Sequence, residues 1–318
     1  MRYDRQTILP EIGPQGQARF AAAHVLVVGA GGLGSVLLPL LAGAGVGHLR
    51  IIDPDRVEES NLHRQILYRT ADIGRPKARV AAAALTALNP GCRASALVAR
   101  MDPALARAEV PRADLVVDAA DAFVVTYALS DLCAALGRPM ISASVQGRAG
   151  HVGGFCGGAP CYRTLFPDLP ARLQSCATAG VMGPAVAALA AMQAQMVLSV
   201  LLGHSPSPLG QFMTLDLASW RCSGFRFDGA AAPEQPGPQV LSRADLASGD
   251  LVVELRSAAE CPVPPVPGAI RVAPGDLPTM SVGQSGRVVF CCATGLRAWR
   301  AARALAARSE VPVAVLCP

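Results

Sequence analysis

Residues 25–34 read Val-Leu-Val-Val-Gly-Ala-Gly-Gly-Leu-Gly, and a second, mostly apolar run at 48–52 ends directly before Asp53. The apolar start of the first stretch predicts a buried strand, and its glycines fit a tight turn into a following helix. An acidic residue about 20 positions after such a turn is typical of a group that holds a ribose. The two stretches therefore predict a βαβ unit that binds a nucleotide, with Asp53 at the ribose.

Polar residues that follow Asp53 indicate which chemistry this nucleotide undergoes. Residues 60–65 read Ser-Asn-Leu-His-Arg-Gln, and Arg75-Pro76-Lys77 comes soon after. Negative charge builds on phosphate groups when a bond to phosphorus breaks, and fixed cations stabilise that charge. Arg64 and Lys77 can supply two such cations, for which a dehydrogenase has no need. We therefore expect ATP, although the glycine loop alone would also fit a nicotinamide oxidoreductase.

The remaining sequence alternates between short apolar runs and helical patterns. Strands are predicted at 25–29, 48–53, 94–99, 114–118 and 139–144, and helices at 33–44, 75–88, 123–137 and 183–202. Such alternation predicts an α/β fold, a Rossmann-like and mostly parallel sheet with helices on both faces. Its ligand is expected at the carboxyl ends of the strands. Later strands, predicted around 212–217 and 221–227, are expected to be antiparallel.

Composition narrows the class of protein. The chain has 318 residues, more than a single core usually supports, so one large and one small domain are expected. The net charge of +5 is spread thinly, with 16% charged residues, which argues against nucleic acid as the main partner. Ten cysteines do not make a disulfide scaffold at this length, and the first residues lack a signal peptide, so we expect a cytoplasmic protein. Two uncharged stretches, 25–47 and 181–203, are interpreted as buried segments rather than membrane spans.

Seven short motifs, in the same order, resemble the ThiF/MoeB/HesA family, the bacterial relatives of ubiquitin-activating enzymes. The motifs cover roughly residues 1 to 225 and read Arg2-Tyr3-Asp4-Arg5-Gln6, the glycine loop, Asp53-Pro54-Asp55, residues 60–65, Arg75-Pro76-Lys77, Asp118-Ala119-Ala120-Asp121, and Cys176-Ala177-Thr178-Ala179-Gly180-Val181-Met182. Members adenylate the C-terminal glycine of a small sulfur-carrier protein. The resemblance therefore implies ATP as cofactor and a ubiquitin-like carrier with a Gly-Gly end as partner.

The resemblance also implies a set of site residues. The implied nucleotide-binding residues are Arg5, Gly29, Gly31, Gly32, Gly34, Asp53, Ser60, Asn61, Leu62, His63, Arg64, Gln65, Lys77 and Asp121. Of these, Arg64, Lys77 and Asp121 are implied to act in catalysis, with Mg²⁺ held by Asp121. Asp121 also fits a plainer role as the N-cap of a helix that starts at Phe123. Arg5 is implied to reach the phosphates of a neighbouring subunit, which predicts a homodimer.

Three positions depart from the family pattern. The family commonly has Asn directly after the Asp121 position and Arg four residues further on, where this chain has Ala122 and Thr126. Many members also bind structural zinc through two Cys-x-x-Cys pairs. Here Thr164 replaces the second thiol of the Cys161 pair, and no second pair follows Trp220. We therefore expect no zinc site, although Cys156, Cys161 and Cys222 leave a different site open.

A second resemblance lies beyond a linker predicted at 229–239. Residues 287–291 are predicted as a strand, 292–297 as a tight loop and 298–308 as a helix. A cysteine at such a turn lies near backbone N–H groups and the positive end of the helix dipole, which favours a thiolate or persulfide. Cys292 and Gly268-Ala269-Ile270 resemble parts of rhodanese domains. The predicted domains are thus 1–228, which binds ATP, and 240–318, a short rhodanese-like α/β domain, with an inert structural Cys292 as the alternative.

Cys176 is the second candidate thiol. In the family its position carries a thiol that joins the carrier or its sulfur, so the resemblance implies a covalent role; a loop cysteine without such a role stays open. A sulfur donor such as a cysteine desulfurase is the implied further partner, and thiamine or molybdopterin synthesis the implied pathway, with ThiF favoured over MoeB. Other functions left open are adenylation of a small carboxylate or a tRNA base, and partner binding without catalysis.

Overall fold

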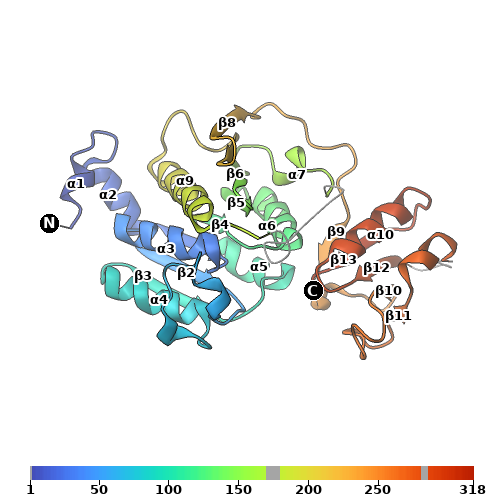
Figure 1. The fold of residues 1–318 in the computed structure, drawn as a ribbon. Helices are drawn as coiled ribbons and strands as arrows, with labels where there is room; N and C mark the ends of the chain where they lie inside the picture. Colours follow the sequence, from blue (N-terminus) through green and yellow to red (C-terminus); the bar gives the residue numbers. More distant parts are fainter. Residues whose placement is uncertain (1, 170–179, 281–285) are drawn as a thin grey trace.

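The computed structural model describes residues 2–169, 180–280 and 286–318, which form two β-sheets (Figure 1). The larger sheet has the strand order β3-β2-β1-β4-β5-β6-β7-β8. Its strands are β1 (His24–Val28), β2 (His48–Ile52), β3 (Arg93–Leu97), β4 (Leu115–Asp118), β5 (Met140–Gln146), β6 (Ala149–Phe155), β7 (Gln211–Asp216) and β8 (Arg221–Arg226). Strands β3 to β5 in this order pair in parallel, and β6 to β8 continue the sheet in antiparallel pairs.

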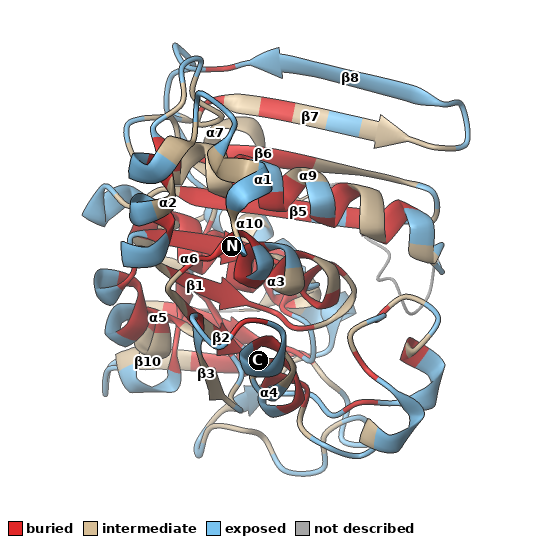
Figure 2. Cartoon of the chain, turned by 90° about the vertical axis from the view of Figure 1, so that its left-hand side faces the viewer, coloured by how far each residue is buried: buried red, intermediate tan, exposed pale blue. Residues whose placement is uncertain are grey.

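Alternate side chains of the central strand β1 enter two different cores. Val25 and Val27 belong to the core under α3 (Gly32–Ala44), α4 (Lys77–Leu88) and α9 (Gly183–Leu202). Leu26 and Val28 belong to the core under α5 (Pro103–Glu109) and α6 (Phe123–Leu136). Successive strand residues point to opposite faces, so a continuous apolar run is what a strand covered on both sides requires. Figure 2 shows the same contrast: β1, β2 and β5 are buried, whereas the edge strand β8 is exposed along its length.

The second sheet is entirely parallel, with the order β11-β10-β12-β13-β9. Its strands are β9 (Gln239–Leu241), β10 (Asp250–Glu254), β11 (Ile270–Arg271), β12 (Arg287–Cys291) and β13 (Val313–Leu316), and α10 (Leu296–Ala306) covers one face. Smaller helices are α1 (Asp4–Thr7), α2 (Gly13–Ala22) and α7 (Tyr162–Leu165).

Helix α6 joins the two sheets into one packed unit. Val125 and Leu129 pack toward the larger sheet, while Val124 and Tyr127 share a core with Trp299 of α10. The aromatic rings of Tyr127 and Trp299 lie 4.5 Å apart between centroids. A helix that is apolar on all sides needs cover on all sides, and α6 obtains it from both sheets.

The predicted α/β fold with a mostly parallel sheet is confirmed. The predicted strands and helices up to residue 202 match the observed ones within about two residues, and β7 and β8 are antiparallel as expected. Strand β6 was not predicted, because its Ala-Gly-His-Val-Gly-Gly-Phe sequence is rich in glycine, a residue depleted in strands. The proposed domain boundaries stay a prediction.

Among the described residues, α9 is the helix long and apolar enough to cross a membrane by length and composition, and half of its most apolar window is buried in the protein. Gln193, near its middle, is buried and donates to the backbone oxygens of Asp118 and Ile141 at 2.7 and 3.2 Å. The helix thus packs on β4 and β5 as a core helix does.

Candidate functional site

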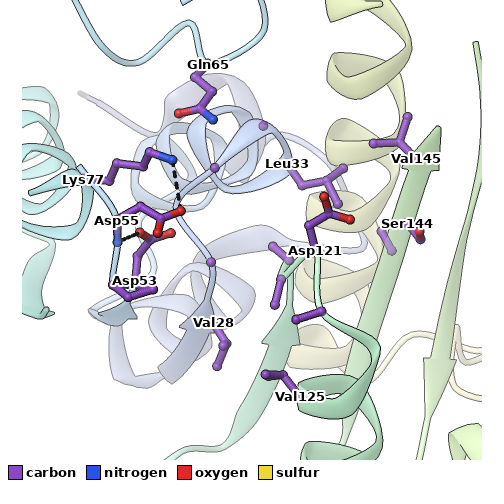
Figure 3. A pocket seen from close by; sticks show the side chains of 18 of the residues that line it. Val28, Leu33, Asp53, Asp55, Gln65, Lys77, Asp121, Val125, Ser144 and Val145 are labelled. Carbon is purple, nitrogen blue, oxygen red and sulfur yellow. Dashed lines mark hydrogen bonds and ion pairs between the residues drawn. The ribbon is translucent and has the colours of Figure 1, made fainter. Parts of the chain in front are cut away.

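A cavity of about 260 Å³ lies at the carboxyl ends of β1, β2 and β4 (Figure 3). Its polar and charged lining comes from segments far apart in the sequence: Asp53, Asp55, Asn61, Arg64, Gln65, Lys77, Arg100, Asp121 and Ser144. Apolar side chains such as Val28, Ile52, Met101 and Val125 line it as well. Figure 3 shows Asp53, Asp55 and Lys77 on one side and Asp121 on the other, beside Ser144 and Val145.

The glycine loop brings backbone close to this cavity. Gly29 has φ +102° and lies so close to the backbone of Ala119 that a Cβ would collide with it. Gly34 packs equally closely on the carbonyl of Gly29. Gly31 and Gly32 line the cavity at the start of α3, where free N–H groups and the helix dipole favour an anion. Gly29, Gly31 and Gly32 therefore line the cavity with backbone, whereas Gly34 lies outside the lining and lets α3 pack on the loop.

Asp53 is held in place by the loops around it. One carboxylate oxygen accepts a hydrogen bond from Ala30 N at 2.7 Å, and the other accepts one from Asp55 N at 2.8 Å. Burial raises the pKa of Asp53, and these two hydrogen bonds, together with the nearby Lys77 charge, oppose that rise. A fixed acceptor at the end of β2 is what a ribose hydroxyl requires.

Lys77 begins α4 and is 5% exposed. Its Nζ lies 3.4 Å from an oxygen of Asp55, whose own side chain is 60% exposed (Figure 3). Tyr68 donates to Ala30 O at 2.5 Å and to Lys77 O at 3.5 Å, which ties the start of this helix to the glycine loop. The cation is thus oriented by its surroundings.

Residues 60–65 divide into two groups. Asn61 Oδ1 accepts from Arg64 Nη2 at 2.8 Å and from Gln65 Nε2 at 3.1 Å, and all three residues line the cavity. Gln65 is buried, and its Oε1 lacks a hydrogen-bond partner among the described residues. The other predicted members, Ser60, Leu62 and His63, are not among the residues that line the cavity. Leu62 packs on the core under α3 and so supports the segment.

Asp121 lies on the loop between β4 and α6, three residues beyond the end of β4. Its side chain lines the cavity. The N-cap position of α6 belongs to Ala122, with no side-chain cap hydrogen bond, so the capping role does not hold. A carboxylate at the cavity into which the glycine loop opens is a ligand of the kind that Mg²⁺ prefers.

The loop that presents Asp121 is held by Asp118, a residue to which the sequence analysis assigned no role. Asp118 is 1% exposed and accepts hydrogen bonds from Thr126 Oγ1 and Ser142 Oγ, each at 2.7 Å, and from Ala120 N at 3.2 Å. Burial raises its pKa to about 6. The Thr126 hydroxyl is therefore hydrogen-bonded to Asp118, and Thr126 is not among the residues that line the cavity.

Other predicted site residues lie elsewhere. Arg5 is exposed in α1, away from the cavity lining, and its role toward a second subunit stays a prediction. Cys176 lies outside the described residues. Cys161 Sγ lies 3.8 Å from Thr164 Oγ1, and the described part of the chain has no group of three or more His, Cys, Asp or Glu residues arranged for a metal.

Cys292 follows β12 and is 3% exposed. Its Sγ accepts a hydrogen bond from Ala298 N at 3.4 Å, within the first turn of α10, and Gly295 at the N-cap has φ +81°. The neighbouring Cys291 points to the other face of the sheet, where Glu254 Oε2 lies 3.5 Å from its sulfur. Burial raises the pKa of Cys291 to about 12, with the Glu254 charge adding to that effect. The two adjacent thiols thus belong to the cores on opposite faces of the sheet.

Comparison with known proteins agrees with this geometry. The sequence pattern of the ThiF family matches residues 3–236. Over 223 residues the chain is 44% identical to the sulfur carrier protein adenylyltransferase of Thermus thermophilus, which covers 68% of this chain and 82% of that protein. It is 39% identical over 232 residues to the sulfur carrier protein ThiS adenylyltransferase of Escherichia coli, with 71% of this chain and 91% of that protein covered.

Longer relatives and solved structures also match. The adenylyltransferase and sulfurtransferase MOCS3 of Bos taurus is 43% identical over 243 residues, 74% of this chain, and the match spans 53% of the MOCS3 length. Among solved structures, E. coli MccB shares the fold at a TM-score of 0.66 and 23% identity, with 74% of this chain and 75% of that chain covered. The family expected from the motifs is confirmed: the chain belongs to the ThiF family.

Proposed function

We propose that the chain uses ATP to adenylate the C-terminal glycine carboxylate of a small ubiquitin-like sulfur-carrier protein. The observation that carries this proposal is that Arg64, Lys77 and Asp121 line the same cavity as the glycine loop and Asp53. The names of the relatives, sulfur carrier protein adenylyltransferase and ThiS adenylyltransferase, support the same reaction and substrate class. ATP is supported further by MccB, which has been crystallised with ATP.

The residues act mainly by positioning and by neutralising charge. The ribose lies on Asp53, and the phosphates lie over the start of α3 and near Asn61, Arg64 and Lys77. A carboxylate oxygen of the carrier attacks the α-phosphorus, the bond from that phosphorus to the bridging oxygen breaks, and pyrophosphate leaves. Arg64 and Lys77 stabilise the charge that builds on the phosphates. Asp121 would hold Mg²⁺, which neutralises phosphate charge when bound.

The later steps move sulfur. The terminal sulfur of a persulfide on Cys292, loaded by a cysteine desulfurase, attacks the acyl carbon and AMP leaves. A second thiol, for which Cys176 is the candidate, then attacks the Cys292 sulfur, so that a disulfide forms and the carrier leaves as a thiocarboxylate. The Cys292 environment, with its N–H donor from Ala298, supports this role. A homodimer, in which Arg5 reaches the neighbouring phosphates, and thiamine or molybdopterin synthesis complete the proposal.

Pyrophosphate exchange into ATP tests the adenylation step. With a Gly-Gly-ended carrier and Mg²⁺, we expect exchange that falls by about 10²-fold or more in Arg64→Ala and Lys77→Met, the usual scale for a charge that stabilises a transition state. Arg79→Ala provides a matched control, because Arg79 lies two residues along α4 on its exposed side. Exchange that is undiminished in both Arg64→Ala and Lys77→Met would contradict the assignment, and exchange with tRNA or a small carboxylate in place of the carrier would redirect it.

A further inference from the structure

A second cavity, of about 210 Å³, lies between the two sheets beside Cys292. It is lined by residues from both parts of the chain: Arg100, Arg243, Arg256, Pro265, Cys291, Cys292, Ala293, Leu316, Cys317 and Pro318. Only Arg100 comes from the larger sheet, where it follows β3 at the carboxyl edge. The cavity therefore brings three guanidinium groups and three thiols together.

The charges in this cavity do not cancel. Arg256 pairs with the fully buried Glu254 through two hydrogen bonds of 2.8 and 2.6 Å, so this cation is compensated. Arg100 and Arg243 are exposed to solvent at the cavity and form no ion pair with any carboxylate in the part of the chain that the structure describes. Asp245, which follows Arg243 closely, pairs instead with Arg107. Two uncompensated guanidinium groups beside one small cavity favour an anionic ligand.

Arg100 also lines the nucleotide cavity, next to Met101, Ile52 and Val125. These apolar side chains suit a nucleobase, and a guanidinium plane stacks on aromatic faces. Met101, the residue after Arg100, contacts a residue that lines the second cavity: its backbone oxygen accepts a hydrogen bond from Cys317 Sγ at 3.7 Å. The family commonly has an arginine at the position of Thr126. Here Arg100 is the third cation that lines the nucleotide cavity, after Arg64 and Lys77.

We propose that the second cavity binds a small oxyanion beside Cys292, and that Arg100 links this site to the nucleotide. The anion site stands on the two guanidinium groups alone, whereas the link rests on the nucleotide placement proposed above. One guanidinium cannot serve both ligands fully at once, so nucleotide binding weakens anion binding. By thermodynamic linkage, the anion weakens nucleotide binding by the same factor.

Alkylation of Cys292 by two reagents of similar size tests the anion site without any nucleotide. Iodoacetate carries a negative charge and iodoacetamide does not, and mass spectrometry of the Cys292 peptide gives the rate of each. Relative to glutathione, we expect the iodoacetate-to-iodoacetamide rate ratio to be raised in the wild type and to fall by about threefold or more in Arg100→Ala and in Arg243→Ala. Arg93→Ala, at the opposite end of β3, is the matched control and should keep the wild-type ratio. An equal ratio in the wild type and both cavity variants would overturn the site.

A non-hydrolysable ATP analogue with Mg²⁺ tests the link. Saturating analogue should lower the wild-type ratio toward that of Arg100→Ala, should lower it in Arg243→Ala as well, and should leave the Arg100→Ala ratio unchanged. Calorimetry establishes separately whether the analogue binds. A ratio that stays constant while the analogue is bound would overturn the link alone, whereas an analogue that fails to bind the wild type would overturn the link together with the proposed nucleotide placement.

Discussion

The nucleotide cavity and the Cys292 cavity both lie at the carboxyl ends of parallel strands, yet they are built in different ways. In the first, polar groups follow consecutive strands of one sheet, and backbone N–H groups and short hydrogen bonds fix them, as at Asp53 and Asn61. The second takes its walls from both parts of the chain, which also pack together where α10 meets α6. The first site is therefore a property of one sheet, and the second a property of an interface.

Removal of the largest side chain at that interface should give the largest difference in effect between the two sites. Trp299 is fully buried, packs on Tyr127 and donates through Nε1 to Asp168 at 2.7 Å. Trp299→Ala should lower the free energy of unfolding by about 3–5 kcal/mol, because it leaves a large cavity and removes the hydrogen bond to Asp168, which keeps its ion pair with Arg303. Urea denaturation followed by circular dichroism measures this change. The matched control is Trp220→Ala, which removes a side chain that is 84% exposed and should cost about 0.5 kcal/mol or less.

Nucleotide affinity in the same variant sharpens the comparison. Because Asp53, Arg64 and Lys77 take their positions from the larger sheet and its loops, Trp299→Ala should bind ATP about as well as the wild type. The Arg243-dependent preference of Cys292 for iodoacetate should be lost. Equal damage to both sites would show that the nucleotide cavity also depends on the interface.

A smaller effect is expected from the buried carboxylate under the Asp121 loop. The folded pKa of Asp118 is raised to about 6, so between about pH 4 and pH 6 the folded protein keeps a proton that the unfolded chain releases. This group therefore lowers stability as the pH rises through that window, by about 2–3 kcal/mol in total for a shift of about two pKa units. Asp118→Asn removes the ionisation, so its free energy of unfolding, relative to the wild type, should increase by that amount from pH 4 to pH 7.

The donors to Asp118 sharpen this test. Thr126 and Ser142 donate to the carboxylate and favour its charged form, which opposes the effect of burial. Thr126→Val should therefore lose more stability at pH 7 than at pH 4, in urea denaturation at the two pH values. A loss that is the same at both would contradict ionisation of Asp118 within this window.

Much of the nucleotide cavity was predictable because its residues follow strands in a fixed order. The residues of the prediction that line the cavity are Gly29, Gly31, Gly32, Asp53, Asn61, Arg64, Gln65, Lys77 and Asp121. Ser60, Leu62 and His63 do not line the cavity, and a continuous motif does not reveal which of its side chains turn toward the ligand. In a 3₁₀ turn such as Glu59–Asn61, neighbouring residues point in different directions.

What the sequence missed depends on contacts between distant segments. Arg100 and Met101 follow β3 without any motif, and Arg100 lines the second cavity only because the second sheet packs beside the first. Asp118 lies within a recognised motif, but its burial depends on Thr126 and Ser142, which belong to other elements. The position after a predicted parallel strand was the one available signal for Arg100, because such positions gather at the ligand edge of a sheet.

The smallest expected effect on adenylation comes from substitution of the adjacent thiols Cys291 and Cys292, which face opposite sides of the second sheet. Adenylation needs neither, since the attacking group is the carrier's carboxylate, so Cys292→Ser and Cys291→Ser should both keep wild-type pyrophosphate exchange. Sulfur loading requires a thiolate, and Cys291 is a poor candidate because burial raises its pKa to about 12 and Glu254 lies 3.5 Å from its sulfur. After incubation with a cysteine desulfurase and cysteine, mass spectrometry should therefore find the persulfide in Cys291→Ser and not in Cys292→Ser. A persulfide that persists in Cys292→Ser would make the loop at the start of α10 structural, and it would move the sulfur-transfer role to another thiol of the chain.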